Sequence, residues 1–235
     1  MNVLIVYAHP EPASFNGAMM RTARDTLAAA GHEVDVSDLY GMGFEPVSDR
    51  RNFTGCADPR YFRQQDEERH ASATDGFAPD VAAEMDKLFR CDLLLFQFPM
   101  WWFGMPAILK GWCDRVLAAG RVYDRGRWYE NGTMAGKRAL CALTTGGEAA
   151  MFGPDGLCGD MDALLYPVQH GVFHFLGFKP LQPFVVWRAA RLTDEQRAAE
   201  LARFRVELLA LAQRPVIAYR PRTDYDERYA LQRHA

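Results

Sequence analysis

The chain has 235 residues, a length that suits one α/β domain with or without a short appendage. Its 27 basic and 30 acidic side chains give a net charge of −3, which provides no excess of positive charge for nucleic acid or an anionic membrane. The five cysteines are odd in number and form no CxxC motif, so reduced thiols are favoured over a disulfide framework. No signal-peptide pattern is found, and the longest apolar run, residues 98–109, is interrupted by proline and glycine and is too short to span a bilayer. We therefore expect a cytoplasmic protein with no nucleic-acid partner and no stable membrane insertion.

The first 40 residues predict a β-loop-α-β unit. Residues 3–8 form a continuous apolar run with β-branched members, which is typical of a buried parallel strand. Two prolines break regular structure just after it, and Ser14 is a good N-cap for a helix over residues 15–30 that ends at Gly31. Residues 33–39 alternate enough to form a second strand. This order predicts a right-handed crossover and a parallel sheet.

Residues 41–78 are less regular, and a long segment of this kind is usually functional or part of an interface. Beyond it, strands and helices alternate. We predict strands over residues 92–98, 138–145 and 180–187, and helices over residues 79–89, 106–119, 161–175 and 193–213. Five buried strands alternating with helices predict a doubly wound α/β fold, with a five-stranded parallel sheet and helices on both faces.

In such sheets, ligands bind beyond the carboxyl ends of the strands. The exit of the first strand leads into a helix N-terminus, where backbone N–H groups and the side chains of His9, Ser14 and Asn16 suit a phosphate. No GxGxxG and no GxxxxGK[ST] follows the strand, which disfavours a Rossmann dinucleotide site and a nucleoside triphosphate site. The alternative is an ordinary helix cap without a ligand.

Two further strand exits predict a site for a planar ring. Residues 99–106 (PMWWFGMP) place bulky aromatic side chains directly after a buried strand, where they would cover a flat ligand such as a flavin, or a partner chain. The alternative is a dense core loop. Residues 144–147 (TTGG) let the backbone approach a ligand closely, although many strands end in two glycines. Together the three exits indicate one site for phosphate and two walls for a ring.

The chain resembles the NAD(P)H:quinone oxidoreductase family. The resemblance runs from residue 3 to about residue 211, and it is most specific in residues 96–99 (FQFP), 102–112 (WFGMPAILKGW) and 144–147 (TTGG). It implies a flavodoxin-like fold, tightly bound FAD, and a homodimer whose two active sites lie at the subunit interface. It also implies two-electron reduction of quinone-like acceptors by NAD(P)H, in a ping-pong cycle with hydride transfer through flavin N5. On this basis we expect a flavin-binding domain over residues 1–213 and a tail over residues 214–235 that packs on the domain or on the dimer partner.

The resemblance also implies a set of cofactor-binding positions. They surround the pyrophosphate, the ring and its polar edge, with Arg63 near the adenine and Arg197 near the adenosine phosphate. The full set is His9, Ser14, Phe15, Asn16, Arg63, Pro99, Met100, Trp101, Trp102, Phe103, Thr144, Thr145, Gly146, Gly147 and Arg197.

Five positions in and around the expected catalytic pocket can be compared with the family pattern, and one of them matches it while four depart from it. Phe152 and Cys158 stand where the animal enzymes carry a Tyr and a His, and neither side chain can bond the flavin edge as a phenol and an imidazole would. Tyr123 matches one of two substrate-pocket tyrosines, whereas Arg125 replaces the other and would favour an anionic or carboxylated acceptor. Trp101 replaces a Gln on the flavin wall. We therefore expect hydride transfer to be retained and the rate and acceptor preference to differ.

His170 and His174 lie four residues apart on one predicted helix, a spacing that could bind a metal. One branch of the family uses such a pair together with a later Cys. The equivalent position here is Ala218, so packed or interface histidines are favoured and no metal is expected.

Two other functions stay open at this point. One is an FMN-dependent nitro or azo reductase, although residues 41–78 and the last helix offer surface for an adenosine and so favour FAD. The other is an ancillary regulatory subunit or electron carrier of a membrane transport system. The sequence identifies neither the physiological acceptor nor a preference between NADH and NADPH.

Overall fold

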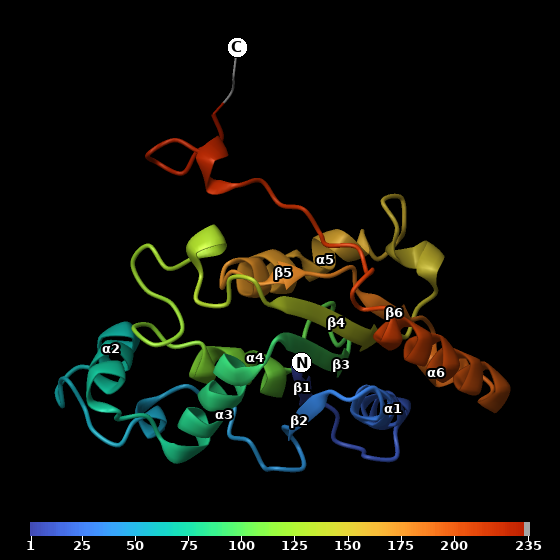
Figure 1. Ribbon diagram of the computed structural model, residues 1–235, viewed down its shortest axis with the longest axis horizontal. Coiled ribbons are helices and arrows are strands. Elements are labelled where there is room, and N and C mark those ends of the chain that lie inside the picture. Colours follow the sequence, from blue (N-terminus) through green and yellow to red (C-terminus); the bar gives the residue numbers. More distant parts are fainter. Residues whose placement is uncertain (233–235) are drawn as a thin grey trace.

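The computed structural model describes residues 1–232 and contains a parallel sheet between two layers of helices (Figure 1). The strand order is β2-β1-β3-β4-β5, and β6 also pairs with β4. The strands are β1 (Asn2–Tyr7), β2 (Glu33–Asp38), β3 (Leu93–Pro99), β4 (Arg138–Thr144), β5 (Lys179–Pro180) and β6 (Phe184–Val186). The order and the parallel pairing confirm the predicted flavodoxin-like doubly wound fold.

Both faces of the sheet are covered because the strand side chains alternate between two apolar clusters. Val3 and Ile5 of β1 pack with α1 (Phe15–Ala29) and α6 (Asp194–Leu209) on one face. Leu4 and Val6 pack on the other face. The helices on that second face are α3 (Pro79–Arg90), α4 (Ala107–Val116) and α5 (Met161–Val168).

Two helix starts are fixed by side-chain caps, and the cap at Ser14 is the predicted one. The Ser14 hydroxyl accepts a hydrogen bond from the Gly17 N–H at 3.1 Å. Thr193 and Gln196 form a reciprocal capping box at the start of α6. These caps fix where the chain turns from a strand exit into a helix.

Other boundaries differ from the prediction. The segment over residues 41–78 contains α2 (Gln64–Thr74), and α4 ends at Val116 rather than at residue 119. The helix predicted over residues 161–175 becomes a π-helix over Gln169–His174, where the Phe175 N–H reaches back five residues to the His170 carbonyl. The single strand predicted over residues 180–187 is divided into β5 and β6, because Pro183 has no N–H and the Gln182 N–H donates to the Pro215 carbonyl instead.

The C-terminal segment leaves the domain surface as an extended chain (Figure 1). Ile217 donates to the Pro180 carbonyl, and the Tyr219 ring then lies 4.8 Å from that of His170. The Arg222 N–H donates to the Glu130 carboxylate at 3.1 Å. The division at residues 213 and 214 remains a prediction, and residues 233–235 of the predicted tail lie outside the described residues. None of the helices described in residues 1–232 has the length and apolar character needed to cross a membrane.

Candidate active site

A cleft of about 770 Å³ opens where the carboxyl ends of β1, β3 and β4 meet. All three predicted strand exits contribute to its walls, and α6 contributes a fourth. The predicted residues that line it are His9, Ser14, Phe15, Asn16, Pro99, Met100, Trp101, Thr144, Thr145, Gly146 and Arg197. The parallel sheet therefore brings together segments that lie up to about 190 residues apart, as expected for a site at the strand ends.

The N-terminus of α1 faces the cleft with unused donors. Ser14 satisfies the Gly17 N–H, and helix geometry leaves the N–H groups of Phe15 and Asn16 without an intrahelical acceptor. His9 Nδ1 lies 3.0 Å from the Glu11 N–H and 3.2 Å from the Glu11 carbonyl, and in the tautomer that accepts the Glu11 N–H the ring proton is on Nε2. This end of the cleft can therefore bind a phosphate with two backbone donors and one imidazole donor.

The Asn16 side chain connects the three strand exits. Its amide nitrogen donates to the Thr144 hydroxyl at 2.9 Å, and its amide oxygen accepts from the Gln97 side chain at 2.8 Å. The residue is only 5% exposed. Its side chain therefore holds the edge of the sheet together, and its backbone N–H is the group left to face the cleft.

The aromatic segment after β3 forms a tight turn. The N–H groups of Trp101 and Gly104 each donate to the other residue's carbonyl, at 3.1 and 3.0 Å. Between them, Trp102 and Phe103 have φ values of 49° and 60°, a left-handed conformation that costs a bulky residue roughly 1–2 kcal/mol. Trp101 lines the cleft, whereas Trp102 is 96% exposed and Phe103 is 50% exposed. Such strain and exposure together are typical of a functional surface.

The two glycines after β4 have different roles. A Cβ added to Gly146 would meet nothing within 4 Å, and this residue lines the cleft. A Cβ added to Gly147 would lie 2.9 Å from the Phe152 ring and 3.1 Å from the Met151 sulfur. Gly146 therefore leaves room for a ligand, and Gly147 allows the Phe152 loop to pack.

Sequence reasoning missed lining residues in the segment between β6 and α6 and in α6 itself. Ala189, Ala190, Asp194 and Leu201 line the cleft, as do Ala13 and Ala18 near α1. The capping box that begins at Thr193 was a usable signal, because it marks another helix start directly beyond a strand end. The alanines could not be identified as lining residues from the sequence, because an alanine side chain has no functional group that indicates a ligand.

Comparisons with known proteins agree with this geometry. A family model described as a flavodoxin-like fold matches residues 1–210. The ribosyldihydronicotinamide dehydrogenase (quinone) of Mus musculus is 45% identical over 201 residues, which are 85% of this chain and 87% of the relative. The NAD(P)H dehydrogenase (quinone) 1 of Cavia porcellus is 38% identical over 224 residues, 95% of this chain and 82% of the relative. The chain belongs to the NAD(P)H:quinone oxidoreductase family.

A solved structure supports the same assignment. A crystal structure from Klebsiella pneumoniae, described as that of a quinone reductase, superposes with a TM-score of 0.93 at 39% identity, covering 99% of this chain and 94% of that one. An NAD(P)H:quinone oxidoreductase from Methanothermobacter marburgensis gives 0.68 at 26% identity, covering 90% and 96%. The family fold therefore extends over nearly the whole chain.

The predicted catalytic residues lie around the cleft rather than on its walls. Phe152 is buried with its ring 5.5 Å from that of Trp187, and Cys158 is partly buried beside the same loop. Tyr123 accepts a hydrogen bond from Gln65 at 3.2 Å, and burial raises the pKa of its hydroxyl. None of the three lines the cleft of a single chain.

Four more predicted residues also lie off the cleft walls. Arg125 is exposed, and Arg63 places its guanidinium 4.8 Å from the ring centre of Tyr61 at the start of α2. The two others are Trp102 and Phe103, which point out of the single chain. Such residues contribute to a site only if a second surface meets them.

The histidine pair lies on the π-helix, with ring centres 5.3 Å apart. Burial lowers the pKa of both His170 and His174. Within residues 1–232, no group of three His, Cys, Asp or Glu side chains is placed to hold a metal ion.

Proposed function

We propose that the protein is an FAD-dependent oxidoreductase that transfers two electrons from NAD(P)H to quinone-like acceptors in a ping-pong cycle. One observation carries the proposal: free helix N–H groups, a strained aromatic turn and an open glycine converge on one cleft of about 770 Å³. The names of the relatives, which are quinone-reducing dehydrogenases, support the same reaction class.

The residues present fit a flavin. The N–H groups of Phe15 and Asn16 and the Nε2–H of His9 would hold the pyrophosphate, where the dipole of α1 favours negative charge. The open face of Gly146 gives the ring system room, and Trp101 supplies an apolar wall that excludes water. The flavin, when bound, supplies the centre that accepts and then donates a hydride.

FAD is favoured over FMN because the cleft continues beyond the strand ends to α6. Arg197 and Leu201 of that helix line it, and an adenosine phosphate would lie within reach of the Arg197 guanidinium. That guanidinium is paired with Asp194 at 2.6 Å, so it is already oriented on the helix surface.

A homodimer with shared active sites accounts for the residues that a single chain leaves exposed. Trp102 and Phe103 present a large apolar surface that a second copy would cover. Tyr123 and Arg125 would then contribute to the acceptor side from the partner subunit. The positive charge of Arg125 would favour acceptors that carry a carboxylate.

The test begins with the purified protein, which should be yellow, release FAD on denaturation, and oxidise NAD(P)H steadily with a quinone and without a stable semiquinone. A Gly146→Val variant should lose at least about ten-fold in flavin affinity, because its side chain fills the open face of the cleft. Gly55→Val is the matched control, since Gly55 is also open, carries no left-handed φ, and lies away from the cleft. A colourless protein that binds no added flavin, or equal flavin affinity in both variants, would contradict the proposal.

A further inference from the structure

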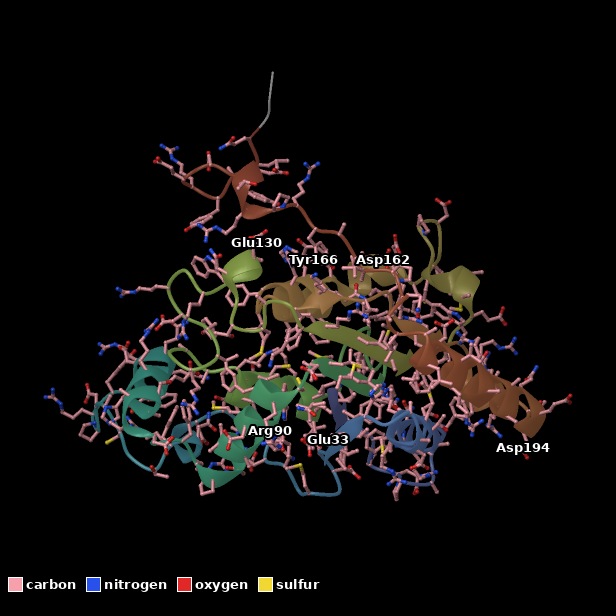
Figure 2. All side chains as sticks on the ribbon, viewed as in Figure 1. Glu33, Arg90, Glu130, Asp162, Tyr166 and Asp194 are labelled. Carbon is pink, nitrogen blue, oxygen red and sulfur yellow. The ribbon has the colours of Figure 1, made fainter. Side chains whose placement is uncertain are left out.

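A second cavity of about 250 Å³ lies beneath the C-terminal segment, and we call it the tail pocket. The π-helix contributes His170 and His174, the tail contributes Arg220 and Arg222, and four tyrosines complete the lining. None of these residues lines the cleft at the strand ends. Figure 2 shows Tyr166 on the side of the domain that the tail crosses, well apart from Asp194 at the cleft. The tail pocket is therefore a separate site.

The charge of the tail pocket favours an anion. Its lining residues include two arginines and no aspartate or glutamate. Arg220 has only a distant partner, Asp224 at 3.7 Å, and Arg222 uses its backbone N–H rather than its guanidinium to contact Glu130. Arginine binds planar carboxylates with two parallel hydrogen bonds, so the two arginines of the lining are suited to that group.

The walls of the tail pocket are flat and aromatic. The ring of Tyr166 stacks on that of His170, with centres 4.6 Å apart and planes within 8°. The ring of Tyr129 lies 5.2 Å from that of His174. Burial lowers the pKa of both histidines, so at neutral pH each ring is uncharged and still offers one N–H donor. Such walls suit a planar ring rather than an extended aliphatic chain.

The backbone around the tail pocket is strained. Tyr129 and Tyr229 both line it and have φ values of 51° and 61°, left-handed conformations that bulky residues rarely adopt. The two histidines lie on the π-helix, a form that is rare and concentrated at functional sites. The aromatic turn of the candidate active site shows the same left-handed strain at Trp102 and Phe103. Strain of this kind persists where function requires the geometry.

We propose that the tail pocket binds an aromatic carboxylate, a function beyond the proposed reduction of quinones. The aromatic ring packs against the tyrosine and histidine rings that line the cavity, and the carboxylate binds the guanidinium of Arg222 with support from Arg220. The lining contains no third metal ligand beside the two histidines.

The experiment titrates 2-naphthoate onto the purified, flavin-loaded protein by isothermal calorimetry, with the uncharged 2-naphthamide as the ligand control. Naphthoate should bind about ten-fold more tightly than the amide, and Arg222→Gln should remove about that factor. Arg220→Gln should weaken binding in the same direction. Arg228→Gln is the matched control, because Arg228 is an exposed arginine of the same tail that does not line the pocket, and its affinity should be unchanged.

Three results would overturn the proposal. Naphthoate and naphthamide could bind equally, which would show that the charge is not recognised. Arg222→Gln could bind naphthoate as tightly as the unmodified protein. Binding could also be lost in Tyr123→Ala and retained in Arg222→Gln, which would place the ligand on the acceptor side of the active site instead of in the tail pocket.

Discussion

The cleft at the strand ends and the tail pocket differ in what holds them together. The cleft is formed where parallel strands end together, and the buried Asn16 amide joins β3, β4 and α1 by hydrogen bonds of 2.8 and 2.9 Å. The tail pocket is closed by an extended segment, which is held by a few contacts such as that between Arg222 and Glu130. Left-handed aromatic residues accompany both sites: Trp102 and Phe103 follow Trp101 in the turn beside the cleft, and Tyr129 and Tyr229 line the tail pocket. Local strain is therefore common to both sites. The difference is that only the cleft is supported by the core of the fold.

The largest expected effect tests that dependence on the core. Asn16→Leu would leave the Gln97 amide and the Thr144 hydroxyl without their buried partner, so the free energy of unfolding should fall by about 2–4 kcal/mol. Flavin affinity should fall as well, because the ends of β3 and β4 would no longer be held in place against α1. Replacing the charged guanidinium of the tail pocket by a neutral amide, in Arg222→Gln, should change the free energy of unfolding by less than about 0.5 kcal/mol. Urea unfolding measures both, and equal losses would show that the two sites do not differ in this way.

A smaller effect tests the feature that the two sites share. Trp102→Gly and Tyr229→Gly each remove a left-handed bulky residue that is 96% or 60% exposed, so little packing is lost. Each should raise the free energy of unfolding by about 0.5–1 kcal/mol, the relief of strain less the added freedom of glycine in the unfolded chain. Trp101→Gly is the control, because Trp101 is in the same turn without a left-handed φ, and it should lower stability. If the Trp102 variant is destabilised as much as the control, its conformation is not strained.

The sequence was sufficient for the cleft because its signals are local. The runs that end at Ala8, Phe98 and Thr145 each identified a strand, and parallel strands must end at the same edge of the sheet. The Ser14 and Thr193 caps were equally readable, since each depends on residues within one helical turn.

The tail pocket could not be found in this way, because its geometry depends on contacts between distant segments. The last strand is divided by Pro183 and by pairing with the tail, and a polar tail carries no periodic signal for that pairing. The π-helix interrupts a pattern that reads as a continuous α-helix through Phe175. Gly146 and Gly147 are likewise indistinguishable in sequence, although one opens to the cleft and the other packs on Phe152.

The smallest expected effect is a pH dependence that comes from the tail pocket. For His174, burial and then the neighbouring His170 lower the pKa, while Glu130 acts in the opposite direction. The unfolded chain therefore takes up a proton before the folded one, so stability should fall as the pH drops below the ordinary histidine pKa of 6.5. Thermal unfolding between pH about 7.5 and about 5.5 measures the slope, which should become shallower in His174→Asn. Bound naphthoate should also make it shallower, because a carboxylate near the imidazole stabilises its protonated form. An identical slope with and without the ligand would mean that the anion does not reach the histidines, and the tail pocket would then be a structural cavity.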